Sequence, residues 1–247
     1  MLNPITYTEQ VVGDFLRYQL STYAFADADL YQQMRELLNL EQTRNTPLMK
    51  GPFISLSRTF QEGAPLEQLV NEGVLHPHIK QLSPYPSAYR HQEQAFRAIH
   101  AGQPTLVATG TGSGKTECFL YPIISRCLQL RDESAPAGIT AVIVYPMNAL
   151  AEDQLQRMRA LLAGTGVSFG MYVGKTPRTE ADVTGVRLPP GSTAADYKAK
   201  LASMQQQKQD RALHPAEERA SRESMRKPGD QPRILLTNVK QLELLLT

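Results

Sequence analysis

A chain of 247 residues is long enough to bury a sizeable core and to form one or two domains. Its composition, with 41% hydrophobic and 20% charged residues, is ordinary for a soluble protein. The 26 lysines and arginines against 24 aspartates and glutamates give a net charge of only +2. No overall basic field therefore indicates a nucleic-acid partner, and any such binding would have to come from local groups.

Features of secretion and of membrane insertion are missing from the sequence. The N-terminus lacks the basic and apolar regions of a signal peptide, and no apolar run approaches the roughly 18 residues that span a bilayer. The two cysteines, Cys118 and Cys127, do not have the spacing of metal ligands and are typical of small apolar side chains in a reducing compartment. We expect a cytoplasmic protein without a membrane partner.

The first 81 residues are predicted to form a mainly helical N-terminal region. Apolar residues recur at helical spacing between residues 11 and 20 and again between 30 and 38, which predicts two helices. Residues 48–82 are punctuated by glycine and proline, and we expect one short helix there, over 65–72.

The stretch from Thr105 to Thr116, TLVATGTGSGKT, has the pattern of a phosphate-binding loop. Its apolar residues predict a buried strand over 105–109, and glycines at positions 110, 112 and 114 lead into a helix that begins at Lys115. Such a loop lets backbone N–H groups approach an anion at the positive end of a helix. Lys115 supplies a cation for the β- and γ-phosphates, and the Thr116 hydroxyl is placed to bind Mg²⁺. We predict an ATP-type nucleotide site, although Thr109 stands where the pattern usually has glycine.

A helix is predicted upstream of this loop, from about Ser87 or Tyr89 to His100. Because it delivers the chain into the predicted strand, its beginning can lie beside the loop. Gln92 is near that beginning, and its amide offers one donor group and one acceptor, which match N7 and N6 of adenine. A glutamine on a helix is usually only solvated. The position of Gln92 relative to the loop is what favours a role in adenine recognition.

After the loop, strands and helices alternate. Apolar runs predict a buried strand at Ala141–Tyr145 and further strands at 167–173 and 233–237, with helices at 149–162 and up to Leu246. This alternation predicts an α/β fold with a parallel sheet flanked by helices.

The region between residues 176 and 231 interrupts the alternation. It is rich in charge and has two polar segments, 193–213 and 215–226, that we predict to be helical. Its apolar residues are too few for a separate core, so we expect a charged helical insert that projects or is partly disordered. It offers a surface for nucleic acid or a protein partner, but a solvated insert is the simpler interpretation.

The order of these motifs resembles the first RecA-like domain of superfamily 2 helicases of the DEAD/DEAH-box type. The resemblance covers residues 82–247, which we interpret as a partial RecA-like domain. Five segments carry it, in this order: Tyr89-Arg90-His91-Gln92, Thr109–Thr116, Tyr145–Gln154 (YPMNALAEDQ), Tyr172–Thr176 (YVGKT) and Thr237-Asn238 with the helix after it. The details lean toward large bacterial helicases of the mitomycin-repair and Hrq types, and toward very large phage-defence members such as those of Druantia systems.

The resemblance implies an ATP-dependent helicase or translocase that uses ATP and Mg²⁺ and binds nucleic acid, with DNA favoured over RNA. It implies three groups of residues. Catalysis and Mg²⁺ binding fall to Lys115 and Thr116. The nucleotide site comprises Tyr89, Arg90, Gln92, Thr111, Gly112, Ser113, Gly114, Lys115 and Thr116. The nucleic-acid strand lies along Pro146, Asn148, Gly174, Thr237 and Asn238.

The family's acidic motif II and its second RecA-like domain do not follow Thr237 in this sequence. Fast hydrolysis needs a carboxylate to position Mg²⁺ and water and a cation for the transferring phosphoryl group. We therefore expect the 247 residues to be the N-terminal part of a longer enzyme and to be inactive alone.

Two other interpretations remain. The chain could be a nucleotide-responsive assembly module of a multi-subunit defence complex, with its N-terminal region or insert binding partner subunits. A small-molecule P-loop kinase is disfavoured because it explains neither the YPMNALAEDQ segment nor the glutamine upstream of the loop.

Overall fold

The computed structural model describes residues 3–22, 25–38, 59–209 and 211–246. The part of the predicted N-terminal region between residues 39 and 58 lies outside the described residues. The chain divides into two compact units, residues 1–59 and 60–247. Residues 60–81, which we had placed with the N-terminal region, thus belong to the second unit.

The described part of the first unit consists of two helices, as predicted. Helix α1 runs from Pro4 to Thr22 and α2 from Ala28 to Leu37. Asp27 caps α2, because its carboxylate accepts hydrogen bonds from the backbone N–H groups of Asp29 (2.9 Å) and Leu30 (3.0 Å).

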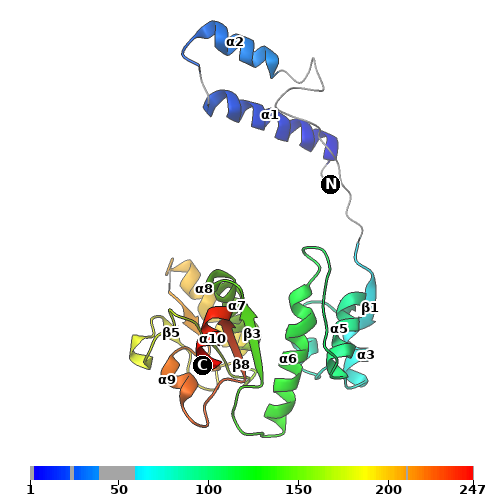
Figure 1. The fold of residues 1–247 in the computed structure, drawn as a ribbon, viewed down its shortest axis with the longest axis vertical. Helices are drawn as coiled ribbons and strands as arrows, with labels where there is room; N and C mark the ends of the chain where they lie inside the picture. Colours follow the sequence, from blue (N-terminus) through cyan, green and yellow to red (C-terminus); the bar gives the residue numbers. More distant parts are fainter. Residues whose placement is uncertain (1–2, 23–24, 39–58, 210, 247) are drawn as a thin grey trace. The chain divides into compact units, whose positions relative to one another are not determined.

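The second unit begins with a small antiparallel pair of strands and three helices. Strand β1 (Glu62–Pro65) pairs with β2 (Ser87–Tyr89), and between them lie α3 (Leu66–Asn71) and α4 (Ile79–Leu82). Helix α5 (Arg90–His100) follows and lies alongside α6 (Lys115–Asp132) (Figure 1). Side chains of α3 and α4 belong to the main hydrophobic core, so this segment is part of the unit's packing.

The expected strand over 105–109 is not formed, although these five residues are all described. They run as an irregular segment, and Leu106 is 94% exposed. A strand needs a neighbour to satisfy its backbone N–H and C=O groups, and no described strand pairs with this segment. The predicted strand over 105–109 is therefore wrong, because an apolar pattern without a neighbouring strand to pair with does not form a strand.

A four-stranded parallel sheet forms the centre of the unit, in the order β3-β8-β4-β7. The strands are β3 (Ala141–Tyr145), β8 (Ile234–Asn238), β4 (Phe169–Tyr172) and β7 (Glu218–Arg219), with α7 (Asn148–Leu162) after β3 and α10 (Val239–Leu246) after β8. The predicted α/β fold class is confirmed. Full burial of β3 is not, because β3 is an edge strand of the described sheet and Val142 and Val144 are exposed.

The insert folds onto this sheet and differs from the predicted helical projection. It contains a short 3₁₀ turn at Glu180–Asp182, parallel strands β5 (Val186–Arg187) and β6 (Leu213–His214), and helices α8 (Ala194–Gln206) and α9 (Arg222–Arg226), while β7 joins the main sheet. Leu188, Tyr197, Met204 and Leu213 bury themselves with Ala163, the residue after α7. The prediction that the insert has too few apolar residues to pack is wrong, because these residues pack against Ala163, which lies outside the insert.

None of the helices in the described residues is long and apolar enough to cross a bilayer.

Candidate nucleotide and nucleic-acid site

The glycine-rich loop before α6 is held by its own lysine. Lys115 donates from Nζ to the carbonyl oxygens of Thr109 (2.8 Å) and Gly110 (2.7 Å). The hydroxyls of Thr109 and Ser113 lie 2.6 Å apart, and Ser113 is buried. Thr109, the departure from the usual pattern, thus closes the loop through a side-chain hydrogen bond that glycine could not make.

Gly112 and Gly114 have the backbone angles that make this loop possible, with φ of +73° and +72°. At Gly114 a Cβ atom would also lie 2.4 Å from Gln92 Nε2 and 3.2 Å from Glu117 Oε2. The Gln92 amide donates to the Gly114 carbonyl oxygen over 3.0 Å. The absence of a side chain at Gly114 therefore allows α5 to contact the loop directly.

The first turn of α5 supplies two contacts to the loop. Gln92 is largely buried, and its Oε1 accepts a hydrogen bond from the Tyr89 N–H (2.9 Å) while its Nε2 reaches Gly114. His91 Nε2 lies 2.8 Å from the Ser113 carbonyl oxygen. Because a carbonyl only accepts, Nε2 carries the proton in this contact. Sequence reasoning singled out Gln92 and missed His91, although the same proximity argument applied to both.

A cavity of about 410 Å³ lies between the start of α5 and the loop. Four predicted nucleotide-site residues line it, namely Tyr89, Gln92, Gly112 and Gly114, and Phe96, Glu117 and Tyr121 contribute to its other walls. Burial raises the pKa of Tyr121, so its phenol stays neutral at physiological pH.

The other predicted residues do not line this cavity. The guanidinium of Arg90 turns to Gln61 Oε1 (3.2 Å), and Ser113 is enclosed within the loop. Thr111, Lys115 and Thr116 belong to the loop and to the start of α6. The structure thus brings Tyr89 and Gln92 together with the loop, and it separates Arg90 from them.

An aromatic group surrounds Tyr89. The ring centroid of Phe60 lies 5.4 Å from that of Tyr89 and 5.7 Å from that of His91, and the rings of Tyr89 and His91 are stacked at 5.8 Å. Phe60 had no signal in the sequence, because it is far from Tyr89 along the chain and belongs to no motif. Partly exposed rings of this kind offer a stacking surface for a planar base.

The loop residues fit a nucleotide phosphate and its metal ion. Positive-φ glycines, the Lys115 ammonium and the start of α6 together form a cationic cradle. The Thr116 side chain makes no hydrogen bond to any described residue, so its hydroxyl is available to a cation. Mg²⁺ binds through few protein ligands together with phosphate oxygens and water, which suits a single hydroxyl.

Helix α6 is linked to α7 by an ion pair between Glu117 and Arg157, both partly buried. Glu117 also lines the cavity, so this pair joins the wall of the nucleotide cavity to the helix that follows β3. The two residues are 40 positions apart, so no sequence pattern predicted this ion pair.

The predicted nucleic-acid residues gather at the carboxyl edge of the parallel sheet. Pro146 and Asn148 follow β3, Gly174 follows β4, and Asn238 ends β8. The Asn238 amide donates to Asn148 Oδ1 (2.6 Å), and its own Oδ1 accepts from the Gln241 N–H (2.7 Å) at the start of α10. Side chains from two strand ends therefore meet at this edge.

Thr237 differs from this group. It is fully buried, and its hydroxyl donates to the Tyr172 carbonyl oxygen (2.7 Å). This hydrogen bond holds β8 to β4, and the buried side chain of Thr237 is not exposed to a nucleic-acid strand at the surface.

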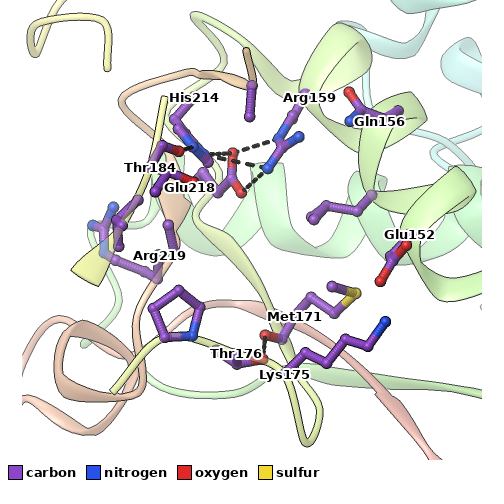
Figure 2. Close-up of a pocket in the computed structure, with 15 residues that line it drawn as sticks. Glu152, Gln156, Arg159, Met171, Lys175, Thr176, Thr184, His214, Glu218 and Arg219 are labelled. Atoms are coloured by element: carbon purple, nitrogen blue, oxygen red, sulfur yellow. Dashed lines mark hydrogen bonds and ion pairs between the residues drawn. The ribbon is translucent and has the colours of Figure 1, made fainter. Parts of the chain in front are cut away.

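A second pocket, of about 290 Å³, lies between α7 and the insert (Figure 2). At one side Arg159 donates to both carboxylate oxygens of Glu218 (2.7 Å each), and His214 Nδ1 lies 3.0 Å from Glu218 Oε2 (Figure 2). Burial alone would raise the pKa of Glu218, but the hydrogen bonds from His214 and Arg159 outweigh it and lower that pKa. The buried contacts of Arg159 with Glu218 and His214 hold the insert on α7. The exposed Lys175 and Glu152 line the same pocket.

Comparisons with known proteins show a similarity to helicases. Residues 89–190 match the sequence profile of the DEAD/DEAH box helicase family. The chain is 33% identical over 185 residues to the Druantia protein DruE of Escherichia coli (strain UMEA 4076-1), covering 65% of this chain and 10% of that protein. It is 29% identical over 89 residues to the ATP-dependent helicase HRQ1 of Saccharomyces cerevisiae, covering 36% of this chain and 8% of that protein.

Among solved structures, the crystal structure of the DUF1998 helicase MrfA bound to DNA and AMPPNP aligns with 73% of this chain and 18% of its own, at 22% identity and a TM-score of 0.42. The chain spans between 8% and 21% of the length of these and other curated relatives that it matches.

Proposed function

We propose that the chain is the ATP-binding part of a nucleic-acid helicase or translocase, on the basis of the match of residues 89–190 to the DEAD/DEAH box helicase family. The observation that carries this proposal is the contact between Gln92 and Gly114. This contact supports the proposal because the glutamine proposed to recognise adenine and the glycine-rich loop line one cavity.

In this proposal Gln92 reads the adenine edge and Tyr89, with Phe60 beside it, packs on the base. Gln92 keeps one amide hydrogen and one lone pair beyond its contacts to Gly114 and Tyr89, so it can still bind a base. The loop from Thr111 to Gly114 holds the phosphates with Lys115, and Thr116 holds Mg²⁺. Bound Mg²⁺ would neutralise charge on the phosphates.

The nucleic-acid backbone would lie across the carboxyl edge of the sheet, over Pro146, Asn148, Gly174 and Asn238. The hydrogen bond between Asn148 and Asn238 supports this, because it arranges two amides from different strands at one exposed edge. We favour DNA over RNA and a role in antiviral defence, on the strength of the resemblance to the Druantia and Hrq types. The buried free cysteines suit a reducing compartment such as the cytoplasm.

Replacing Lys115 with alanine in the full-length protein tests the proposal. Lys115→Ala removes the cation that meets the β- and γ-phosphates, so we expect ATP-driven unwinding or translocation to be abolished, measured with a fluorescent forked duplex. Lys80→Ala is the matched control, because Lys80 makes an exposed ion pair with Glu67 far from the loop in sequence. Undiminished unwinding by Lys115→Ala would sink the proposal.

A further inference from the structure

Helix α9 of the insert is fastened to the loop that follows β4. Arg222, the first residue of α9, donates from Nη2 to the carbonyl oxygens of Val173 (3.1 Å) and Gly174 (2.9 Å). Its backbone N–H donates to the Pro177 carbonyl oxygen (2.8 Å). The insert therefore reaches the carboxyl edge of the sheet at the position of Gly174.

The two arginines of α9 both lie over one aromatic ring. The guanidinium carbons of Arg222 and Arg226 lie 5.1 Å and 5.4 Å from the ring centroid of Tyr172, and Arg226 Nη2 also contacts the Tyr172 hydroxyl. Met225 is buried between them against Leu235. A Cβ atom at Gly170 would lie 2.8 Å from the Met225 sulfur, so α9 lies directly on β4. These contacts fix the arginine side chains in position.

Neither arginine is neutralised. Within the described residues no carboxylate forms an ion pair with Arg222 or Arg226, whereas Arg187 and Arg219 of the same insert pair with Glu180 and Asp230. A rigid guanidinium without an acid is suited to a phosphate oxygen, which it can bind through its remaining N–H groups.

We propose that α9 is a further nucleic-acid contact, in which Arg226 and the adjacent exposed Lys227 bind phosphates of the strand beside Gly174. Arg222 is a positioning residue that holds the Gly174 loop. This inference rests on the proposed path along the carboxyl edge and extends it onto the insert. The contact is to the backbone and is therefore independent of base sequence.

The test measures the affinity of the full-length protein for single-stranded DNA by fluorescence anisotropy over a series of salt concentrations. Each phosphate contact releases a counterion, so Arg226→Gln should weaken binding equally for different sequences and reduce the slope of log K against log salt by about 1. Lys227→Gln should act in the same direction, and the Lys227 side chain is exposed and forms no hydrogen bond or ion pair with the described residues.

Lys198→Gln is the matched control. It removes the same charge from the same insert, but Lys198 is in α8, which begins next to Gly164. A Cβ atom at Gly164 would lie 2.7 Å from the Ala194 nitrogen. Gly164 follows the C-terminal end of α7, whereas the carboxyl edge of the sheet is at the N-terminal end of α7. Its salt slope should equal that of the unmodified protein. Arg226→Lys should retain most of the slope, because the charge remains.

Asn148→Ala distinguishes a failure of the α9 contact from a failure of the proposed nucleic-acid path along the carboxyl edge. If it weakens binding while Arg226→Gln and Lys227→Gln leave the slope unchanged, the role of α9 is overturned and the proposed path survives. If none of these variants changes binding, the path along the carboxyl edge falls as well.

Discussion

Gly114 combines two requirements at one position of the phosphate loop. Its φ of +72° is costly for any other residue, and a Cβ atom there would meet the Gln92 amide at 2.4 Å. A side chain would therefore strain the loop and also push α5 away from it. The geometry of the nucleotide cavity depends on this missing side chain.

Gly114→Ala should weaken ATP binding by roughly tenfold or more and lower the free energy of unfolding by about 1–3 kcal/mol. The binding can be measured by titration with a fluorescent ATP analogue and the stability by urea unfolding. Gly73→Ala is the control, because Gly73 has a φ of +75° but nothing within 4 Å of its Cβ position. It should lose stability and keep ATP binding. Equal affinities for both variants would contradict the role of the Gln92 contact.

Single residues were predictable where a short motif carries the chemistry. Lys115, Thr116 and Gln92 could be identified because the phosphate loop and the helix before it are close in sequence. Phe60, Glu117 and Arg157 could not, since their contacts depend on how α5, α6 and α7 pack. The resemblance places Thr237 along the nucleic-acid strand, whereas in the structure its hydroxyl is buried and donates to the Tyr172 carbonyl oxygen.

Helix α7 is held on two sides by arginines two residues apart. Arg157 pairs with Glu117 of α6, and Arg159 pairs with Glu218 of the insert. The second pair is almost fully buried, and His214 also contacts the Glu218 carboxylate. An ion pair in such a place costs much to break, because the remaining charge is left buried.

Glu218→Gln should therefore lower the free energy of unfolding at pH 7 by about 3–5 kcal/mol. Since the folded-state pKa of Glu218 is lowered, its contribution is present above the unfolded-state pKa and is lost as the pH falls through the folded-state pKa. The variant should thus show a weaker loss of stability in acid than the unmodified protein.

Urea unfolding between pH 7 and pH 3 would measure both effects. Glu67→Gln is the control, because its ion pair with Lys80 is exposed and worth about 1 kcal/mol or less. A Glu218→Gln protein as stable as this control at pH 7 would show that the buried cluster does not fasten the insert.

Elements were predicted well where periodicity and packing agree. The helices α5 and α7 and the strand β3 are found close to their predicted bounds, and α6 begins at Lys115 as predicted. The segment 105–109 has an equally apolar pattern but no neighbouring strand, and pattern alone cannot supply one. In the insert, short strands replaced much of the predicted helix because Leu213 and Glu218 find partners on β5, α7 and β4.

At the scale of the whole chain, the core of the second unit draws on residues from Ala64 to Leu236. Leu66, Leu69 and Ile79 are buried in it, although they precede the motifs by which the domain is recognised. The alternation of strands and helices was enough to predict the α/β class, but the start of the compact unit could not be read from the motifs.

A chain that begins at Phe60 should unfold cooperatively and bind ATP, whereas one that begins at Gln81 should lose stability severely. The second deletion removes several buried apolar side chains, each worth about 2–5 kcal/mol. Circular dichroism during heating, with and without an ATP analogue, would compare the two. Equal stability of both chains would show that residues 60–80 are not part of the folding unit.

The position of β3 has a practical consequence for work with this chain. Among the described strands β3 pairs only with β8, so the backbone groups on its other side are open, and Val142 and Val144 are 44% and 39% exposed beside them. An apolar strand with an open edge is a template for pairing with another molecule. The isolated chain is therefore expected to aggregate with rising concentration, and binding experiments on it belong at low concentration, with sedimentation or light scattering run alongside.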